Sequence, residues 1–443
     1  MMNRYTKKDI IRLVEEEDVE FIRLQFVDIF GTLKNTAVTT SQLDKILNNK
    51  CAFDGGAIEG FFGVERTELF LYPDLDTFEI FPWRPQQGKV ARFICDVYNP
   101  DGTPFESDPR YILKRVLADA AKSGYTIHVG PECEFFLFDE NEQGGATTNT
   151  NEKGGYFDIG PTDMGENARR DMVLTLEEMG FEVESSFHAD APAQHEIDFK
   201  YTDALKTADN IVTFKLVVRT VAKRHGLHAT FMPKPKQGVK GSGMHVNMSI
   251  SKDGKNIFSD QTDNEISKEA KSFIAGIMEH ICALTLINNP IVNSYKRLVP
   301  GYEAPVCIGW SKANCSPLIR VSGIGGEGTK VELRSPDTAS NPYLVLAGCI
   351  AAGLDGINRE LTAPDSFDRS IQEMTAKEIK AVGIKVLPNN LYEAIAAFEE
   401  DEYMKGIFGE HIINNYISAK QEEWKQYCLQ VSPWEVEQYL HKI

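Results

Sequence analysis

Two glutamates two residues apart are the first candidates for chemistry in this sequence. Glu132 and Glu134 lie in the apolar and aromatic stretch Val129–Phe138, which is entered through Gly130-Pro131, so we expect a strand. Side chains two apart on a strand share a face. Like charges at that spacing repel unless a cation lies between them, and a hard divalent metal with oxygen ligands fills that role. For this stretch alone, two exposed glutamates on a half-solvated strand also explain the pattern.

Three further expected strands, over residues 195–200, 241–250 and 330–334, repeat this arrangement. The side chains predicted to share a face are Glu196 with Asp198, His245 with Asn247 and Ser249, and Glu332 with Arg334. A lone histidine in such a strand is more often a structural residue. If the four faces converge, their charges are too costly to bury unpaired and require divalent cations. A mostly carboxylate set with one imidazole favours Mg²⁺ or Mn²⁺ over Zn²⁺.

Arginines are interleaved with these acids along the chain. Arg297, Arg320 and Arg334 offer planar guanidinium groups that pair with carboxylate or phosphate. Metals and arginines around an anion predict phosphoryl transfer from a nucleotide. The sequence contains no G-x-x-x-x-G-K-[ST] motif, which excludes a P-loop as the nucleotide site.

Length and composition set the frame for these groups. A chain of 443 residues is expected to form two domains, and the turn-rich segment Asn99–Pro104 predicts domains at 1–103 and 104–443. The net charge of −18 disfavours nucleic acid and anionic membranes as partners. Eight scattered cysteines and the lack of an apolar leader or membrane-length apolar run predict a cytoplasmic protein.

Several local patterns predict the elements that position the site. In the first domain we expect a helix after Thr6, a hairpin over residues 19–39, and a short helix capped by Ser41. A glycine-rich loop at 53–61 then presents Asp54, either as a functional group or within a flexible turn. In the second domain, expected helices cover residues 109–122, 167–179, 213–225, 267–286 and 341–357, and helices fill the last 75 or so residues.

Eight motifs now resemble one family. They are FDGGAIEGF at 53–61, GPECEFFLF at 130–138, QHEIDF at 194–199, FMPKP at 231–235, GSGMHVN at 241–247, NSYKRLVPGYEAP at 293–305, VELRSPD at 331–337 and NPYLVLA at 341–347. From Thr6 to Tyr439 the chain resembles the type I bacterial glutamine synthetases, in the short Gram-positive form that is not adenylylated. The resemblance implies an α+β fold: a small N-terminal β-grasp domain and a larger catalytic domain with a curved antiparallel sheet flanked by helices.

The resemblance also implies an activity and an assembly. Family members join glutamate and ammonium to form glutamine, using ATP and Mg²⁺ or Mn²⁺, through a γ-glutamyl phosphate. Their active sites lie between the β-grasp domain of one subunit and the catalytic domain of the next, in two stacked hexameric rings. A homo-oligomer of that kind is therefore the expected state of this chain.

By the same resemblance, each candidate residue receives a role. The implied roles are first-metal ligands Glu134 and Glu196; second-metal ligands Glu132, His245 and Glu332; glutamate and phosphoryl contacts Arg297 and Arg334; the nucleotide contact Arg320 and the glutamate contact Gly241; the ammonium base Asp54; and the closing gate Glu303. Asn247 and Ser249, on the strand face of His245, are further candidates for binding the nucleotide.

Several positions depart from the family pattern. The run Phe187-His188-Ala189 replaces the family's HHE, so a first-metal ligand is missing. Asp190 is one residue along and points to the opposite face of a strand unless a bulge turns it. Further departures from expected polar or charged residues are Gly56, Ala57, Gly63, Lys240, Cys315, Gly325 and Lys330.

These departures leave three hypotheses. The chain is a working or impaired glutamine synthetase in which water or Asp190 completes the metal shell, a related γ-glutamyl ligase that uses another amine, or a catalytically degenerate paralogue with a regulatory or assembly role. Loss of one transition-state donor costs about 10²- to 10³-fold in rate. Several such losses together would abolish the standard reaction.

Overall fold

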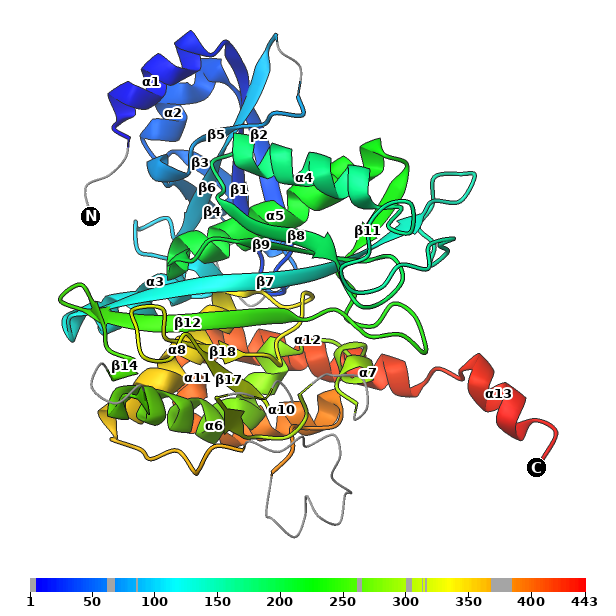
Figure 1. Ribbon diagram of the computed structural model, residues 1–443. Helices are drawn as coiled ribbons and strands as arrows, with labels where there is room; N and C mark the ends of the chain where they lie inside the picture. Colours follow the sequence, from blue (N-terminus) through cyan, green and yellow to red (C-terminus); the bar gives the residue numbers. More distant parts are fainter. Residues whose placement is uncertain are drawn as a thin grey trace.

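The computed structural model describes residues 5–61, 68–84, 87–260, 265–299, 305–312, 314, 317–367 and 385–443. The N-terminal part of these residues forms a β-grasp domain with strand order β2-β1-β6-β4-β3 and β5 beside β6 (Figure 1). Its elements are α1 (Lys7–Glu16), β1 (Val19–Val27), β2 (Leu33–Thr39), η1 (Thr40–Gln42), α2 (Leu43–Leu47), β3 (Cys51–Asp54), η2 (Gly55–Ala57), β4 (Glu68–Pro73), η3 (Leu75–Thr77), β5 (Glu79–Ile80) and β6 (Lys89–Tyr98).

Local signals in this domain gave one correct cap and one wrong one. Thr6 caps α1 as predicted, because its hydroxyl accepts from the Asp9 N–H while the Asp9 carboxylate accepts from the Thr6 N–H. The cap predicted at Ser41 is wrong. Ser41 lies inside the tighter turn η1, whose Thr40 carbonyl already accepts the Leu43 N–H, and its hydroxyl pairs with that of Thr39 at 2.7 Å. The predicted hairpin is confirmed by the antiparallel pairing of β1 and β2.

A large curved sheet carries the rest of the chain. Its strand order is β16-β17-β18-β12-β7-β9-β8, with β10 and β11 beside β7 and β13 beside β12. The strands are β7 (Tyr125–Asp139), β8 (Val183–His188), β9 (Gln194–Phe199), β10 (Thr202–Asp203), β11 (Leu227–Thr230), β12 (Met244–Lys252), β13 (Lys255–Asn256), β16 (Trp310–Ser311), β17 (Ile319–Ser322) and β18 (Lys330–Leu333). A separate pair consists of β14 (Ser259–Asp260) and β15 (Glu265–Ile266).

Helices cover this sheet on the side of the β-grasp domain and on the side away from it (Figure 1). They are α3 (Pro109–Lys122), α4 (Glu166–Glu178), α5 (Ala204–Arg224), α6 (Lys268–Asn288), α7 (Ser294–Arg297), α8 (Pro342–Asn358), α10 (Leu391–Glu400), α11 (Glu402–Phe408), α12 (Glu410–Cys428) and α13 (Pro433–Tyr439). Helix α5 begins at Ala204 rather than at Thr213, because Asp203 accepts hydrogen bonds from the first-turn N–H groups.

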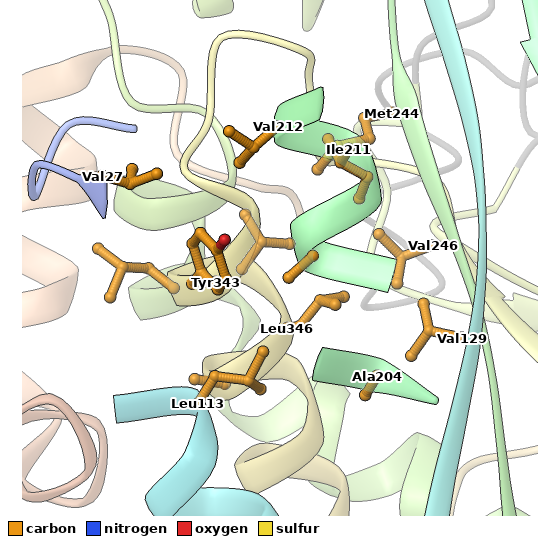
Figure 2. Close-up of a cluster of buried hydrophobic side chains, with 14 of the residues drawn as sticks. Val27, Leu113, Val129, Ala204, Ile211, Val212, Met244, Val246, Tyr343 and Leu346 are labelled. Atoms are coloured by element: carbon orange, nitrogen blue, oxygen red, sulfur yellow. The ribbon is translucent and has the colours of Figure 1, made fainter. Parts of the chain in front are cut away.

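The apolar face of the sheet forms the core. Figure 2 shows Val129 of β7 and Val246 of β12 in one buried cluster with Ile211 of α5 and Leu346 of α8. Because strand side chains alternate, this packing leaves the even-numbered glutamates of β7 on the opposite face. Among the described residues, α6 alone is long and apolar enough to cross a membrane, and 78% of its apolar window is buried inside the protein, as in a core helix.

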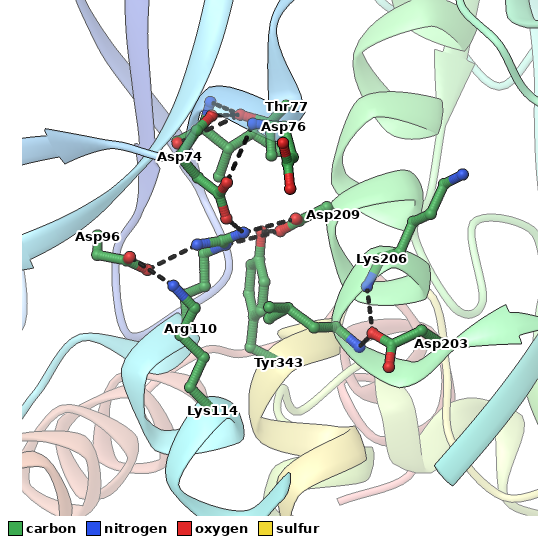
Figure 3. Close-up of polar contacts among 12 residues, drawn as sticks. Asp74, Asp76, Thr77, Asp96, Arg110, Lys114, Asp203, Lys206, Asp209 and Tyr343 are labelled. Carbon is green, nitrogen blue, oxygen red and sulfur yellow. Dashed lines mark hydrogen bonds and ion pairs between the residues drawn. The ribbon is translucent and has the colours of Figure 1, made fainter. Parts of the chain in front are cut away.

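Buried charges join the two parts of the chain. Arg110, on α3, pairs with Asp74 and Asp96 of the β-grasp domain, at 2.7 Å each, and with Asp209 of α5 at 2.9 Å (Figure 3). The Tyr343 hydroxyl donates to the same Asp209. The Arg110 side chain is only 3% exposed. Three carboxylates share its guanidinium, and Lys114 also pairs with Asp96 at 2.5 Å.

Candidate active site

The strand register brings the predicted acids together on the polar face of the large sheet. Directly opposed residues of an antiparallel pair lie side by side on one face. The opposed pairs are Phe187 with Glu196, Glu196 with Glu134, Asp198 with Glu132, Glu132 with His245, Asn247 with Glu332, and Glu332 with Arg320. Five neighbouring strands, β8, β9, β7, β12 and β18, with β17 at the end, therefore supply one continuous row of functional groups.

Glu132, His245 and Glu332 form a carboxylate–imidazole cluster. One ligand atom from each lies within 4.8 Å of the others. His245 Nδ1 is 2.9 Å from Glu132 Oε2 and 3.3 Å from Glu332 Oε1. Burial opposes ionisation of Glu132, but hydrogen bonds from His245 and Asn247 outweigh it and lower its pKa to about 2. Burial likewise opposes the charge on His245, and its two carboxylate partners raise its pKa to about 9.

Glu134 and Glu196 form an acidic pair beside that cluster. Burial, followed by the neighbouring carboxylates of Glu134 and Asp198, raises the pKa of Glu196 to about 11. Burial also raises the pKa of Glu134, although its carboxylate accepts a hydrogen bond from the Gly243 N–H. Two buried carboxylates of raised pKa bind either a proton or a cation. The pair is therefore a second place where a divalent ion fits.

Three arginines complete the cavity that these acids line, whose volume is about 560 Å³. Arg297, at the end of α7, donates to the carbonyls of Ser335 and Arg334. Arg334 Nε lies 3.1 Å from Glu332, and Arg320 Nη1 lies 3.5 Å from it. Since Arg320 is 41% exposed, it is the arginine with most freedom to meet an incoming phosphate.

A side cavity of about 270 Å³ adjoins the main one, because Glu132 and Asp198 line both. Asn247 and Ser249 line the side cavity, as expected for one strand face. Asn247 also donates to Glu132 at 2.9 Å, so it orients a ligand of the cluster. The glycines at 323–328 have G-x-G-x-x-G spacing, but they join the antiparallel strands β17 and β18 and lack the strand–helix context of a dinucleotide site.

Gly241 lines the main cavity at a point where only glycine fits. A Cβ there would lie 2.2 Å from the Pro233 carbonyl oxygen and 3.2 Å from the Arg297 side chain. Glycine is therefore required by the close packing of residue 241 against Pro233 and Arg297. Its carbonyl accepts a hydrogen bond from Gln194, which fixes its direction.

One predicted residue is not brought into these cavities. Asp54 is exposed on the β-grasp domain, where its carboxylate accepts the Gly56 N–H at 2.9 Å, and it lines neither cavity. Glu303 lies outside the described residues, as do Gly63 and Cys315.

Five residues in the main cavity were not among the sequence-predicted site residues. They are Asp198, Asp190, Lys240, Tyr156 and Phe187. Alternation on β9 could have placed Asp198 there. Asp190 reaches the cavity without a bulge, because β8 ends at His188 and the chain turns, with Ala193 at a φ of 68°. Lys240 pairs with Asp190 at 2.8 Å.

A buried acid anchors the loop before α4 to this turn. Glu152 accepts hydrogen bonds from His188 Nε2 at 2.7 Å, from the Met164 N–H at 2.9 Å and from the Ala193 N–H. Its side chain is 4% exposed and that of His188 is fully buried. The residues around Glu152 are mostly polar, so the sequence does not predict that this acid is buried.

The Glu152–His188 pair makes stability depend on pH. Burial opposes the charge on Glu152, but His188 lowers its pKa from 4.5 to about 2, so its contribution is complete above about pH 4.5 and is lost as pH falls toward 2. Burial opposes the charge on His188 as well, yet Glu152 raises its pKa above 6.5. That contribution is complete below about pH 6.5 and is lost as pH rises through the folded-state pKa.

We expect Glu152→Gln to lower the free energy of unfolding by about 3 kcal/mol between pH 5 and 6.5, since each pKa unit is worth about 1.4 kcal/mol. The difference should shrink steadily below pH 4.5. Urea denaturation across this range measures it. Glu360→Gln, which breaks an exposed pair with Lys268, should cost less than about 1 kcal/mol. A pH-independent loss in Glu152→Gln would contradict the assignment.

Comparisons with known proteins identify the family of this site. Residues 18–100 match the family model "Glutamine synthetase, beta-Grasp domain" and residues 106–439 match "Glutamine synthetase, catalytic domain". A glutamine synthetase of Clostridium saccharobutylicum is 61% identical over 442 residues, which is 100% of both chains. A glutamine synthetase of Staphylococcus aureus (strain Mu50) is 54% identical over 438 residues, which is 98% of each chain.

Solved structures agree with these matches. The structure titled "Apo GmaS without ligand" superimposes with a TM-score of 0.88 at 32% identity and covers 98% of this chain and 99% of its own. A Plasmodium falciparum glutamine synthetase has a TM-score of 0.88 at 26% identity and covers 99% of each chain. With both family domains in order and relatives this similar over their full length, the chain belongs to the glutamine synthetase family.

Proposed function

We propose that this chain joins glutamate and ammonium into glutamine with ATP, by way of a γ-glutamyl phosphate. The observation that carries the proposal is the carboxylate–imidazole cluster of Glu132, His245 and Glu332, which borders both the main cavity and the side cavity. A site that joins two cavities is suited to passing a phosphoryl group from a nucleotide in one to an acid in the other.

The donor sets fit the divalent ions that the family uses. Oxygen ligands with one imidazole match Mg²⁺ or Mn²⁺. Glu132, His245 and Glu332 would hold the ion on the nucleotide phosphates, and Glu134 and Glu196 would hold the other. When bound, such ions neutralise the charge that develops on the transferred phosphoryl group.

The remaining residues would bind and orient the substrates. We assign Arg297 and Arg334 to the glutamate carboxylate and the transferred phosphoryl group, and Arg320 to the nucleotide phosphates. Support comes from their common place around Glu332 and Glu134. Gly241 would present its backbone to glutamate, and Asn247 and Ser249 would face the nucleotide in the side cavity.

Residues from a neighbouring subunit would complete the reaction. Asp54 faces solvent in its own subunit, which fits a base that works in the next one and deprotonates ammonium there. Glu303 would close the site. We therefore propose a cytoplasmic homo-oligomer of two stacked hexameric rings, built from domains 1–103 and 104–443.

The acidic pair would bind its metal weakly in this chain. Ala189 provides no ligand where the family has glutamate, and the nearby carboxylate of Asp190 is engaged by Lys240 at 2.8 Å. We expect Ala189→Glu to tighten Mn²⁺ binding at this position by at least about tenfold, since even supporting groups around a metal change affinity by about 10- to 100-fold. Titration of the purified protein with Mn²⁺, followed by electron paramagnetic resonance, measures the change.

The matched control for that prediction is Ala189→Gln, which adds the same volume without a charge. It should bind Mn²⁺ like the unaltered chain. Equal metal affinity and equal activity in Ala189→Glu and the unaltered chain would show that the acidic pair does not lack a ligand.

One assay tests the proposed function as a whole. Purified full-length protein is mixed with Mg²⁺ or Mn²⁺, ATP, glutamate and ammonium, and phosphate release is followed together with glutamine formation. We expect both products in equal amounts. Absence of ATP hydrolysis under all these conditions, from protein that is folded and assembled, would overturn the proposal in favour of a non-catalytic role.

A further inference from the structure

One wall of the main cavity is aromatic rather than charged. Tyr156, Phe157 and Phe187 form this aromatic wall, with ring centroids 4.1 Å apart for Tyr156 and Phe157, 5.7 Å for Tyr156 and Phe187, and 4.9 Å for Phe157 and Phe187. Tyr156 and Phe187 line the cavity itself. More than half of Tyr156 and of Phe157 is exposed, so these rings contact solvent rather than a packed core.

The aromatic wall stands directly beside the acidic pair. Phe187 lies opposite Glu196 in the pairing of β8 and β9, so its ring and that carboxylate share one face. Asp190 lines the same cavity, two residues after the strand that carries Phe187. Aromatic rings next to carboxylates attract a cation that also carries hydrocarbon. Of the three rings only Tyr156 carries a hydroxyl, so Phe157 and Phe187 offer a small hydrated ammonium ion no hydrogen bond.

The wall is held in place rather than loosely exposed. Phe157 has a φ of 62°, a left-handed conformation that costs about 1–3 kcal/mol for such a residue. Its N–H donates to the His188 carbonyl at 3.0 Å, and His188 is in turn tied to Glu152. The anchor described above therefore fixes the loop of Tyr156 and Phe157 against the end of β8, which preorganises the wall.

We propose that the amine subsite of this chain accepts primary amines with a small apolar substituent, in addition to ammonium, with the substituent against Tyr156 and Phe187 and the nitrogen toward Glu196. This inference rests on the function proposed above and names its second substrate class.

The group transfer balances as it does for ammonium. The amine nitrogen forms a bond to the side-chain carbonyl carbon of γ-glutamyl phosphate, the bond from that carbon to the phosphate oxygen breaks, and inorganic phosphate leaves. Of the three protons on the alkylammonium nitrogen, one stays in the amide, one ends on the phosphate and one passes to solvent. The products are a γ-glutamyl alkylamide, ADP and phosphate.

The test compares amines on the full-length protein with Mg²⁺, ATP and glutamate, and two of these amines are matched in size. Phosphate release and mass-spectrometric detection of the amide are measured with ammonium, methylamine, n-propylamine and ethanolamine. We expect kcat/KM for n-propylamine to exceed that for ethanolamine by about tenfold or more, because ethanolamine places a hydroxyl where n-propylamine has its terminal methyl, and an apolar pocket discriminates against such an isostere by about 100-fold at most.

Variants then assign the preference to the aromatic wall. Phe187→Ser should lower the ratio of kcat/KM for n-propylamine to that for ammonium by about tenfold or more. If Phe187→Ser does not fold, Phe187→His serves in its place. It keeps a ring of similar size and should lower the same ratio. Tyr392→Ala, at an exposed ring stacked on Trp424 outside the cavities, should leave the ratio unchanged.

The outcomes separate this inference from the proposed function. Turnover with ammonium but with alkylamine kcat/KM values below about one hundredth of it would overturn the inference and leave the proposed function standing. If both Phe187 variants leave unchanged the ratio of kcat/KM for n-propylamine to that for ammonium, the role of the aromatic wall is overturned. No phosphate release with any amine would overturn both.

Discussion

Replacing Glu332 with glutamine is expected to lower the affinity for Mn²⁺ at the carboxylate–imidazole cluster by on the order of 100-fold, and phosphoryl transfer by at least as much. Glu332 is 3% exposed and lies within 3.5 Å of His245, Arg334 and Arg320. Glutamine keeps its size but removes one negative charge from the ligand set. Mn²⁺ binding without substrates, and steady-state rates over a range of Mg²⁺ concentrations, measure the two effects.

High Mg²⁺ distinguishes a lost ligand from a damaged fold. If Glu332 acts through the metal, part of the lost rate in Glu332→Gln should return as the metal approaches saturation. Glu182→Gln, which changes an exposed acid paired with Lys200, should leave both affinity and rate unchanged. Unaltered Mn²⁺ affinity in Glu332→Gln would place the nucleotide-bound metal elsewhere.

The faces of the site could be predicted from the sequence because strand alternation is local. Glu132 and Glu134 were expected to share a face, and both line the main cavity. Which faces meet depends instead on strand order. His245 contacts Glu132 and Glu332 only because β12 lies between β7 and β18. The length of chain between these strands gives no indication of that order.

The sequence rules failed where the chain stopped being extended. Alternation placed Asp190 on the far face, but the rule ended with β8 at His188 and the following turn directs Asp190 into the cavity. Glu152 follows the polar, turn-rich run 143–151, and the sequence around it gives no sign of a buried acid. It is buried through its contact with His188, a partner that lies 36 residues along the chain. The first miss arises where a strand ends, and the second is a non-local contact that outweighs the local pattern.

Replacing Arg110 with methionine is expected to lower the free energy of unfolding by about 3–5 kcal/mol, because it leaves charged groups buried without their partner. Arg110 joins Asp74 and Asp96 of the β-grasp domain to Asp209 of α5 (Figure 3). Its loss should therefore loosen the contact between the two parts of the chain. Urea denaturation measures the stability, and cleavage at Asp101 by a protease specific for aspartate reports loosening at the exposed turn.

A second substitution separates stranded charge from lost packing. In Arg110→Met the carboxylate of Asp209 keeps only Tyr343 as a donor, so adding Asp209→Asn should restore about 0.5–3 kcal/mol, the usual range for residues in direct contact. Lost packing alone would make the double variant less stable than the single one. Arg12→Met, at an exposed pair with Asp9, should cost less than about 1 kcal/mol. A loss in Arg110→Met no larger than that would mean the three aspartates are stabilised without it.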